Sequence, residues 1–212
     1  QADLAMYQSK EAGRNTLRFF DQHMQAVASA RATMESDLRL ALERGEFLLY
    51  YQPQVDGQGR TTGAEALLRW RHPRRGLVPP TEFIPLAEDT GVIVPLGYWV
   101  IETACGQLRT WALVPALRDL RLAVNVSSRQ FRQTDFVPQV TRILETSGAD
   151  ATRLKFELTE SAVLEDIEDT IEKMDAIRKL GVGLSIDDFG TGYSSLSYLA
   201  RLPLSQLKID RS

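Results

Sequence analysis

Two adjacent carboxylates, Asp187 and Asp188, end a short apolar run and are followed by the flexible loop Gly190-Thr191-Gly192. This order predicts a strand with an acidic end, a loop, and a helix capped by Ser194. In α/β proteins, ligands bind outside the carboxyl ends of the strands. Adjacent strand residues point to opposite faces, so both carboxylates reach one ligand only if the backbone turns after Asp187, as the glycines permit. The alternative interpretation is a polar strand end followed by an ordinary loop.

Other segments with strand-like alternation carry one polar residue each on the face opposite their apolar residues. In a closed barrel the apolar set packs on the helices and the polar set points inward. A group of buried carboxylates needs a cation, and carboxylates with an amide oxygen suit Mg²⁺ or Mn²⁺. The alternatives are chance, or a structural Lys208 that bridges Asp187. The inward set comprises Glu65, Asn125, Glu157, Asp187 and Lys208.

The segments that would position these residues begin with two strands in hairpin order, Phe47–Val55 and Thr61–Trp70. A basic loop over residues 71–76 follows, and Thr81 is expected to cap a short helix. Strands and helices then alternate, which predicts a parallel sheet with helices outside. Six strands are countable in all. The later strands are expected at 120–127, 153–159, 182–188 and 206–210, and the helices at 94–111, 136–146, 167–180 and 195–200.

Composition limits the kind of site. The net charge of −3 shows no general nucleic-acid footprint, so no nucleic-acid polymer is expected as a partner. No apolar run approaches the roughly 20 residues that span a bilayer. Cys105 is the only cysteine, so no internal disulfide can form, and its apolar helical surroundings predict a buried thiol. With only His23 and His72, a histidine-rich zinc or di-iron site is excluded, and a metal must be held mainly by oxygen.

Six short motifs, taken in their order along the chain, resemble those of the EAL family of cyclic di-GMP phosphodiesterases. The resemblance covers roughly residues 35–212. The resemblance implies a modified TIM (β/α)₈ barrel whose first strands are antiparallel, with about six of its eight strands in this chain. A lone Glu-Ala-Leu would carry no weight, whereas six ordered motifs are a strong signal. The motifs are Tyr51-Gln52-Pro53; Glu65-Ala66-Leu67-Leu68-Arg69-Trp70; Asn125-Val126-Ser127; Glu157-Leu158-Thr159-Glu160-Ser161; Asp187-Asp188-Phe189-Gly190-Thr191-Gly192; and Leu207-Lys208-Ile209-Asp210.

The resemblance also implies roles for single residues. A first divalent metal would be held by Glu65, Asn125, Glu157 and Asp187. Asp187 and Asp188 would hold a second metal and orient the attacking water, and Lys208 would contact that water and assist its deprotonation. Arg69 would hold a phosphate of the substrate, and Gln52 would contact the substrate as well. Glu160 would anchor the loop at residues 190–192, which in that family also couples the site to dimerisation.

Each role has an ordinary alternative. Arg69 could pair with a surface acid, and Glu160 could be no more than an acid at a helix start. Arg71, Arg74 and Arg75 would most often be a solvated loop, although they could attract a dianionic substrate.

The two ends of the chain suggest a piece of a longer protein. Residues 2–15 resemble the closing segment of GGDEF (diguanylate cyclase) domains, but the signature loop of that family is absent, so we expect no cyclase activity. The expected division is 1–20 as a GGDEF remnant, 21–34 as a linker helix that packs on its own domain or on a second chain, and 35–212 as an incomplete EAL domain. Because the family's barrel continues for about two more units with a further catalytic glutamate, we expect this piece alone to be a poor catalyst.

The function expected from the resemblance is metal-dependent hydrolysis of cyclic di-GMP to linear pGpG in bacterial signalling, by a cytoplasmic homodimer. The alternatives are a module that binds the dinucleotide without cutting it and a protein-interaction domain.

Overall fold

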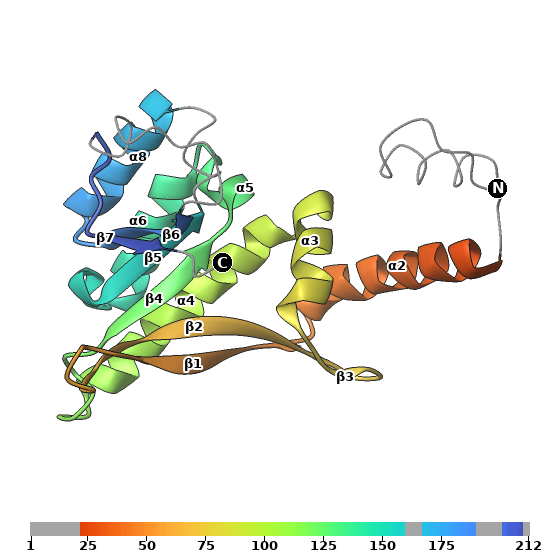
Figure 1. The fold of residues 1–212 in the computed structure, drawn as a ribbon, viewed down its shortest axis with the longest axis horizontal. Helices are drawn as coiled ribbons and strands as arrows, with labels where there is room; N and C mark the ends of the chain where they lie inside the picture. Colours follow the sequence, from red (N-terminus) through yellow and green to blue (C-terminus); the bar gives the residue numbers. More distant parts are fainter. Residues whose placement is uncertain (1–21, 160–166, 190–200, 210–212) are drawn as a thin grey trace.

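The computed structural model describes residues 22–159, 167–189 and 201–209. Within these ranges the chain forms one mostly parallel sheet in the strand order β1-β2-β4-β5-β6-β7, with β3 paired to β2. Figure 1 shows the β1–β2 hairpin at one end of the sheet and β7 at the other. Helices and strands alternate from α4 onward, as the sequence predicts.

The antiparallel end of the sheet is a hairpin of β1 (Phe47–Val55) and β2 (Thr61–His72). Its turn is stabilised by Asp56, whose Oδ1 accepts hydrogen bonds from the backbone N–H groups of Gln58 (2.9 Å) and Arg60 (3.0 Å). A short third strand, β3 (Gly76–Val78), pairs back onto the end of β2. The expected basic loop over 71–76 is therefore wrong in part: it is a second, tighter hairpin.

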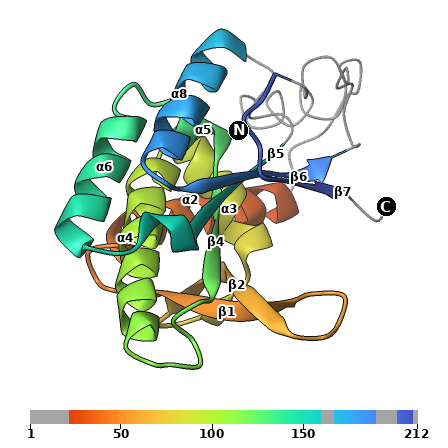
Figure 2. The same ribbon diagram turned by 90° about the vertical axis from the view of Figure 1, so that its left-hand side faces the viewer.

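The parallel strands are β4 (Arg121–Val126), β5 (Leu154–Thr159), β6 (Gly183–Phe189) and β7 (Gln206–Ile209). Helices α4 (Ile93–Ala112), α6 (Phe136–Ser147) and α8 (Ile167–Lys179) pack together along one face of the sheet (Figure 2). The alternate apolar residues of the strands pack against these helices, because successive strand residues face opposite sides. The largest core includes Leu122, Val124, Leu154, Phe156, Leu158, Leu184 and Ile186.

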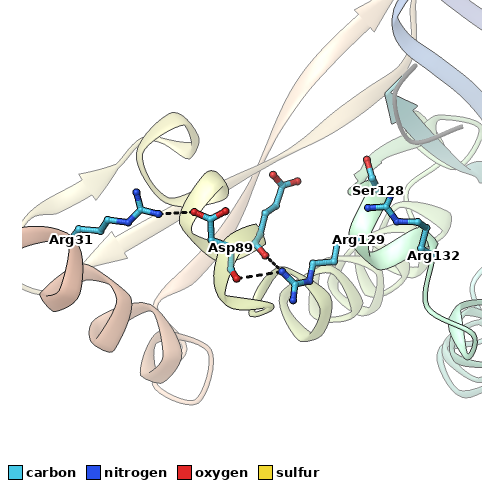
Figure 3. Close-up of a pocket in the computed structure, with 6 residues that line it drawn as sticks. Arg31, Asp89, Ser128, Arg129 and Arg132 are labelled. Atoms are coloured by element: carbon cyan, nitrogen blue, oxygen red, sulfur yellow. Dashed lines mark hydrogen bonds and ion pairs between the residues drawn. The ribbon is translucent and has the colours of Figure 1, made fainter. Parts of the chain in front are cut away.

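The long helix α2 (Gln22–Ala41) lies against the domain through its C-terminal half only. Met34, Leu38 and Ala41 are buried, whereas the described side chains before Met34 are largely exposed. The buried side chains pack with α3 (Pro80–Thr90) and the end of β2 in a second core. Figure 3 shows the outermost contact, in which Arg31 Nη2 donates to Asp89 Oδ2 of α3 at 2.6 Å. Packing on its own domain is thus established for the C-terminal half of the helix.

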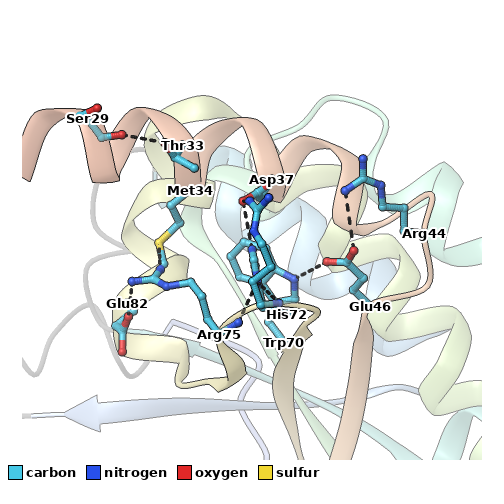
Figure 4. Close-up of polar contacts among 11 residues, drawn as sticks. Ser29, Thr33, Met34, Asp37, Arg44, Glu46, Trp70, His72, Arg75 and Glu82 are labelled. Atoms are coloured by element: carbon cyan, nitrogen blue, oxygen red, sulfur yellow. Dashed lines mark hydrogen bonds and ion pairs between the residues drawn. The ribbon is translucent and has the colours of Figure 1, made fainter.

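Polar contacts fix this end of α2 as well (Figure 4). Asp37 Oδ2 accepts from Arg74 Nη2 at 2.8 Å and lies 3.0 Å from His72 Nε2. His72 Nδ1 accepts from the backbone N–H groups of Arg74 and Arg75, so the ring proton is on Nε2 and points at Asp37. The hydrogen bond from His72, in spite of some burial, holds the pKa of Asp37 below its usual value. Arg74 is therefore paired with Asp37 of helix α2.

Two local expectations about helix ends need correction. Helix α3 begins at Pro80 with Pro79 as its N-cap and has no side-chain cap, because proline already fixes the first-turn backbone; Thr81 is not the cap. A four-residue helix, α5 (Ser128–Phe131), follows β4 and was not expected. Ser127 caps it by accepting from Gln130 N at 3.2 Å. The expected helix at 195–200, with its Ser194 cap, and the remnant at 1–20 lie outside the described residues.

Candidate active site

Side chains from five strands meet at one point on the inner face of the sheet. Lys208 Nζ on β7 donates to Asp187 Oδ2 on β6 at 3.0 Å, to Glu65 Oε2 on β2 at 3.5 Å, and to Glu157 Oε2 on β5. Asn125 Nδ2 on β4 donates to Glu65 Oε1 at 2.8 Å. The structure thus brings together all five residues that strand alternation placed inward.

Strand register explains this convergence. Asn125 pairs with Glu157 across β4 and β5, and Asp187 on β6 pairs with Thr159, two residues beyond Glu157 toward the carboxyl ends. Because parallel strands carry their carboxyl ends at the same edge, residues of matching parity on neighbouring strands point into one space.

Burial and charge make the cluster costly without a counter-ion. The Glu157 side chain is completely buried, while those of Glu65, Asp187 and Lys208 are 22%, 27% and 22% exposed. Burial alone would lower the pKa of Lys208. This effect of burial is outweighed by the hydrogen bonds with Glu157 and Asp187 and by the charges of Glu157 and Glu65. Together they raise the pKa of Lys208, so the lysine stays protonated.

The oxygen atoms of this cluster are of the kind that bind a divalent cation. Three carboxylates and one amide are hard oxygen donors, and they surround an ammonium ion that supplies positive charge where a cation would. Within the ranges that the structure describes, no three acidic, histidine or cysteine side chains are grouped so as to hold a metal as they stand. The carboxylates are turned toward Lys208 instead, so a cation would have to replace the ammonium at their centre.

A cavity of about 300 Å³ opens beside the cluster between β2, β4, β5 and helices α3 to α5. Arg69, Asn125 and Glu157 line it together. Arg69 Nη1 donates to the carbonyl of Leu68 at 2.8 Å, and its guanidinium lies 5.5 Å from the centre of the Tyr50 ring. The arginine is therefore held by the hairpin, with no acidic partner among the contacts that the structure gives it.

The remaining predicted residues are less defined. Gln52 is exposed and stands directly opposite Glu65 in the β1–β2 register. Asp188 belongs to β6, but its side chain, Glu160 and the loop at 190–192 lie outside what the structure describes.

Two residues near the site were missed from the sequence. Gln130 lines the cavity and is only 1% exposed, and its Nε2 has no hydrogen-bond partner in the described part of the chain. Lys155 lies 3.0 Å from Glu157 Oε1. Lys155 shares the parity of Glu157, so the alternation rule could have found it. Gln130 lies within the short helix α5, which was not expected, so the sequence gave no such signal for it.

A second hollow of about 580 Å³ lies apart from this cluster, between α2, α3 and α5 (Figure 3). Asp89 accepts from Arg31 through its carboxylate, and the backbone carbonyls of Glu88 and Asp89 accept from Arg129 Nη1. These contacts link the linker helix to the short helix α5 beyond Asn125.

Comparison with known proteins identifies the family. The EAL domain model matches residues 35–212. The chain belongs to the EAL domain family. A cyclic di-GMP complex of the phosphodiesterase PaMucR superposes with a TM-score of 0.80 at 47% identity, over 84% of this chain and 72% of that one. The barrel fold expected from the sequence is confirmed by this likeness.

Two relatives from Pseudomonas aeruginosa are similar over almost the whole chain. The bifunctional diguanylate cyclase/cyclic di-GMP phosphodiesterase MucR is 47% identical over 99% of this chain and 31% of its own length. The cyclic di-GMP phosphodiesterase NbdA is 46% identical over 100% of this chain and 27% of its own. The chain thus spans about a third or less of the curated relatives that it matches. Among its described helices, none is long and apolar enough to cross a membrane.

Proposed function

We propose that this EAL domain is a metal-dependent phosphodiesterase that hydrolyses cyclic di-GMP to linear pGpG. The observation that carries the proposal is the set of oxygen donors Glu65, Asn125, Glu157 and Asp187 gathered around one ammonium ion. Holding the buried Glu157 next to the partly buried Glu65 and Asp187 is costly, and a bound cation would offset that cost. The relatives' names support the choice of substrate.

The four oxygen donors would hold Mg²⁺ or Mn²⁺, and Asp187 and Asp188 would hold a second ion and orient the attacking water. Such ions supply Lewis-acid stabilisation of the attacking and leaving oxygens of a phosphodiester. Lys208, released from its carboxylates, would contact that water and assist its deprotonation. Arg69 at the cavity wall holds a substrate phosphate through its planar donor fork. Gln52 contacts the substrate from the adjoining strand, and Glu160 anchors the loop at 190–192.

The domain division is part of the proposal. Residues 1–20 close a preceding GGDEF domain, 21–34 form a linker, and 35–212 belong to the EAL domain. The burial of α2 supports a boundary near residue 34, since burial begins at Met34. A homodimer and a cytoplasmic location stay predictions.

The test is pGpG release from cyclic di-GMP, followed by chromatography, with Mg²⁺ and with a chelator. We expect slow release, with Mg²⁺ only, and a further loss of about a hundredfold or more in Glu65→Gln, as for a positioned group in such a site. The matched control is Glu102→Gln, an exposed glutamate that pairs with Arg142 at 3.6 Å. Binding without release would favour the non-catalytic module, and absence of nucleotide binding would favour a protein-interaction domain; either contradicts the proposal.

A further inference from the structure

The buried carboxylate of Glu157 stands between two ammonium ions. Lys208 contacts Oε2 from β7, and Lys155 Nζ lies 3.0 Å from Oε1. Oε1 accepts no hydrogen bond within the described residues, so the approach of Lys155 is an ion pair outside hydrogen-bond geometry. The two oxygens of one carboxylate therefore have separate cationic partners.

Lys155 is held in this position by its surroundings. It shares the inner face of β5 with Glu157, two residues away, and its side chain is only 11% exposed. Its ammonium donates to Gln206 Oε1 on β7 at 2.9 Å, so the side chain spans β6. Its stem runs over Gly183 of β6, where an added Cβ would meet Lys155 Cγ at 3.5 Å. Both the ammonium and the stem are thus fixed.

We propose that Lys155 is a positioning residue that sets the metal preference of the site. By occupying Oε1 it leaves Glu157 a single oxygen, Oε2, for a cation. Mg²⁺ takes six ligands in a near-ideal octahedron, whereas Ca²⁺ takes six to eight oxygens and readily uses both oxygens of a carboxylate. Restricting Glu157 to one oxygen therefore favours the smaller ion. This inference rests on the proposed metal site.

Two effects of removing Lys155 must be separated. Loss of a positive charge near the site strengthens the binding of every dication, because the repulsion falls by the same amount for ions of equal charge. Release of Oε1 strengthens Ca²⁺ binding selectively. The ratio of the Ca²⁺ and Mg²⁺ dissociation constants cancels the first effect and any general loss of stability, and retains the second.

The experiment is calorimetric titration of the full chain with Ca²⁺ and with Mg²⁺, without nucleotide. In Lys155→Met we expect the ratio to move toward Ca²⁺ by about tenfold, within the range of outer-sphere effects on metal sites. Lys155→Arg keeps a cation beside Oε1 and should stay within about twofold of wild type. The control is Lys173→Met on helix α8, because the Lys173 side chain is likewise only 11% exposed and pairs with Asp169 at 2.8 Å.

Gln206→Leu removes only the anchor of the Lys155 ammonium at an exposed position, and it should move the ratio in the same direction by a smaller amount. If Lys155→Met does not fold, the Gln206→Leu variant still tests the inference. An unchanged ratio in the variants that fold, or the same shift in Lys173→Met, overturns the inference. Failure of the wild type to bind either ion overturns the proposed metal site itself.

Discussion

Two glycines of helix α4 offer a matched pair of substitutions with opposite expected effects. A Cβ added to Gly97 would meet Gln130 Oε1 at 2.1 Å and its Cδ at 2.5 Å, whereas a Cβ at Gly106 would meet nothing within 4 Å. Both glycines lie inside the same helix, so alanine brings the same gain in helix propensity at each, about 0.8–1 kcal/mol. Only Gly97→Ala also has to displace a side chain that is 1% exposed.

Overpacking of a tight interior costs about 1–3 kcal/mol. We therefore expect Gly106→Ala to raise the free energy of unfolding by roughly 1 kcal/mol, and Gly97→Ala to leave it unchanged or lower it by up to about 2 kcal/mol. The two variants should differ by about 2 kcal/mol, or about 4–8 °C in melting temperature at this chain length. Because Gln130 lines the cavity beside Arg69, Gly97→Ala should also weaken cyclic di-GMP binding.

Urea denaturation of both variants in a chelator measures the difference directly. Equal stabilisation by the two alanines would refute the reasoning, since it would mean that Gln130 moves aside freely and that the contact between α4 and α5 does not shape the cavity.

Three further predictions concern single side chains. Lys208→Met should lower the free energy of unfolding of the metal-free protein by about 1–3 kcal/mol in urea, less than for a fully buried pair because Lys208 is partly exposed; unchanged stability would contradict its role as counter-ion. Arg69→Ala should reduce cyclic di-GMP affinity by roughly tenfold or more at a melting temperature within a few degrees of wild type, and the opposite pattern would make Arg69 structural. Burial raises the pKa of the Cys105 thiol to about 11 from its ordinary 9.0, so the thiol should react with a disulfide reagent at neutral pH only in denaturant. Because this pKa is raised in the folded state, the contribution of Cys105 to stability is complete below pH 9 and should be lost as the pH rises toward 11; a stability that does not fall there would contradict the buried thiol.

The interior of the site could be predicted from the sequence because strand alternation is a strict geometric rule. Once Glu157 and Asp187 are placed on strands with buried apolar neighbours, both must point to the same side of a parallel sheet. The long helices α4, α6 and α8 begin and end close to where they were expected.

The features that the sequence did not predict depend mostly on contacts between segments that are distant along the chain. The strand β3 arises because residues after His72 pair back onto β2, and His72 itself is fixed by Asp37, far away along the chain. The short helix α5 depends on the single cap at Ser127, which is too local to distinguish from a turn. Lys155 was visible in the pattern, but its partner Gln206 lies two strands away.

The central claim is that the four oxygen donors take up a divalent cation in place of the Lys208 ammonium. Calorimetric titration with Mn²⁺ of the wild type, of Asp187→Asn, and of the control Asp175→Asn tests it most directly. Asp175 is a partly exposed carboxylate on helix α8 that pairs with Arg178 at 3.1 Å. The account predicts binding by the wild type and the control, and an affinity at least about tenfold weaker in Asp187→Asn, since a hard cation needs several charged oxygens. Equal Mn²⁺ affinity in all three proteins would contradict it.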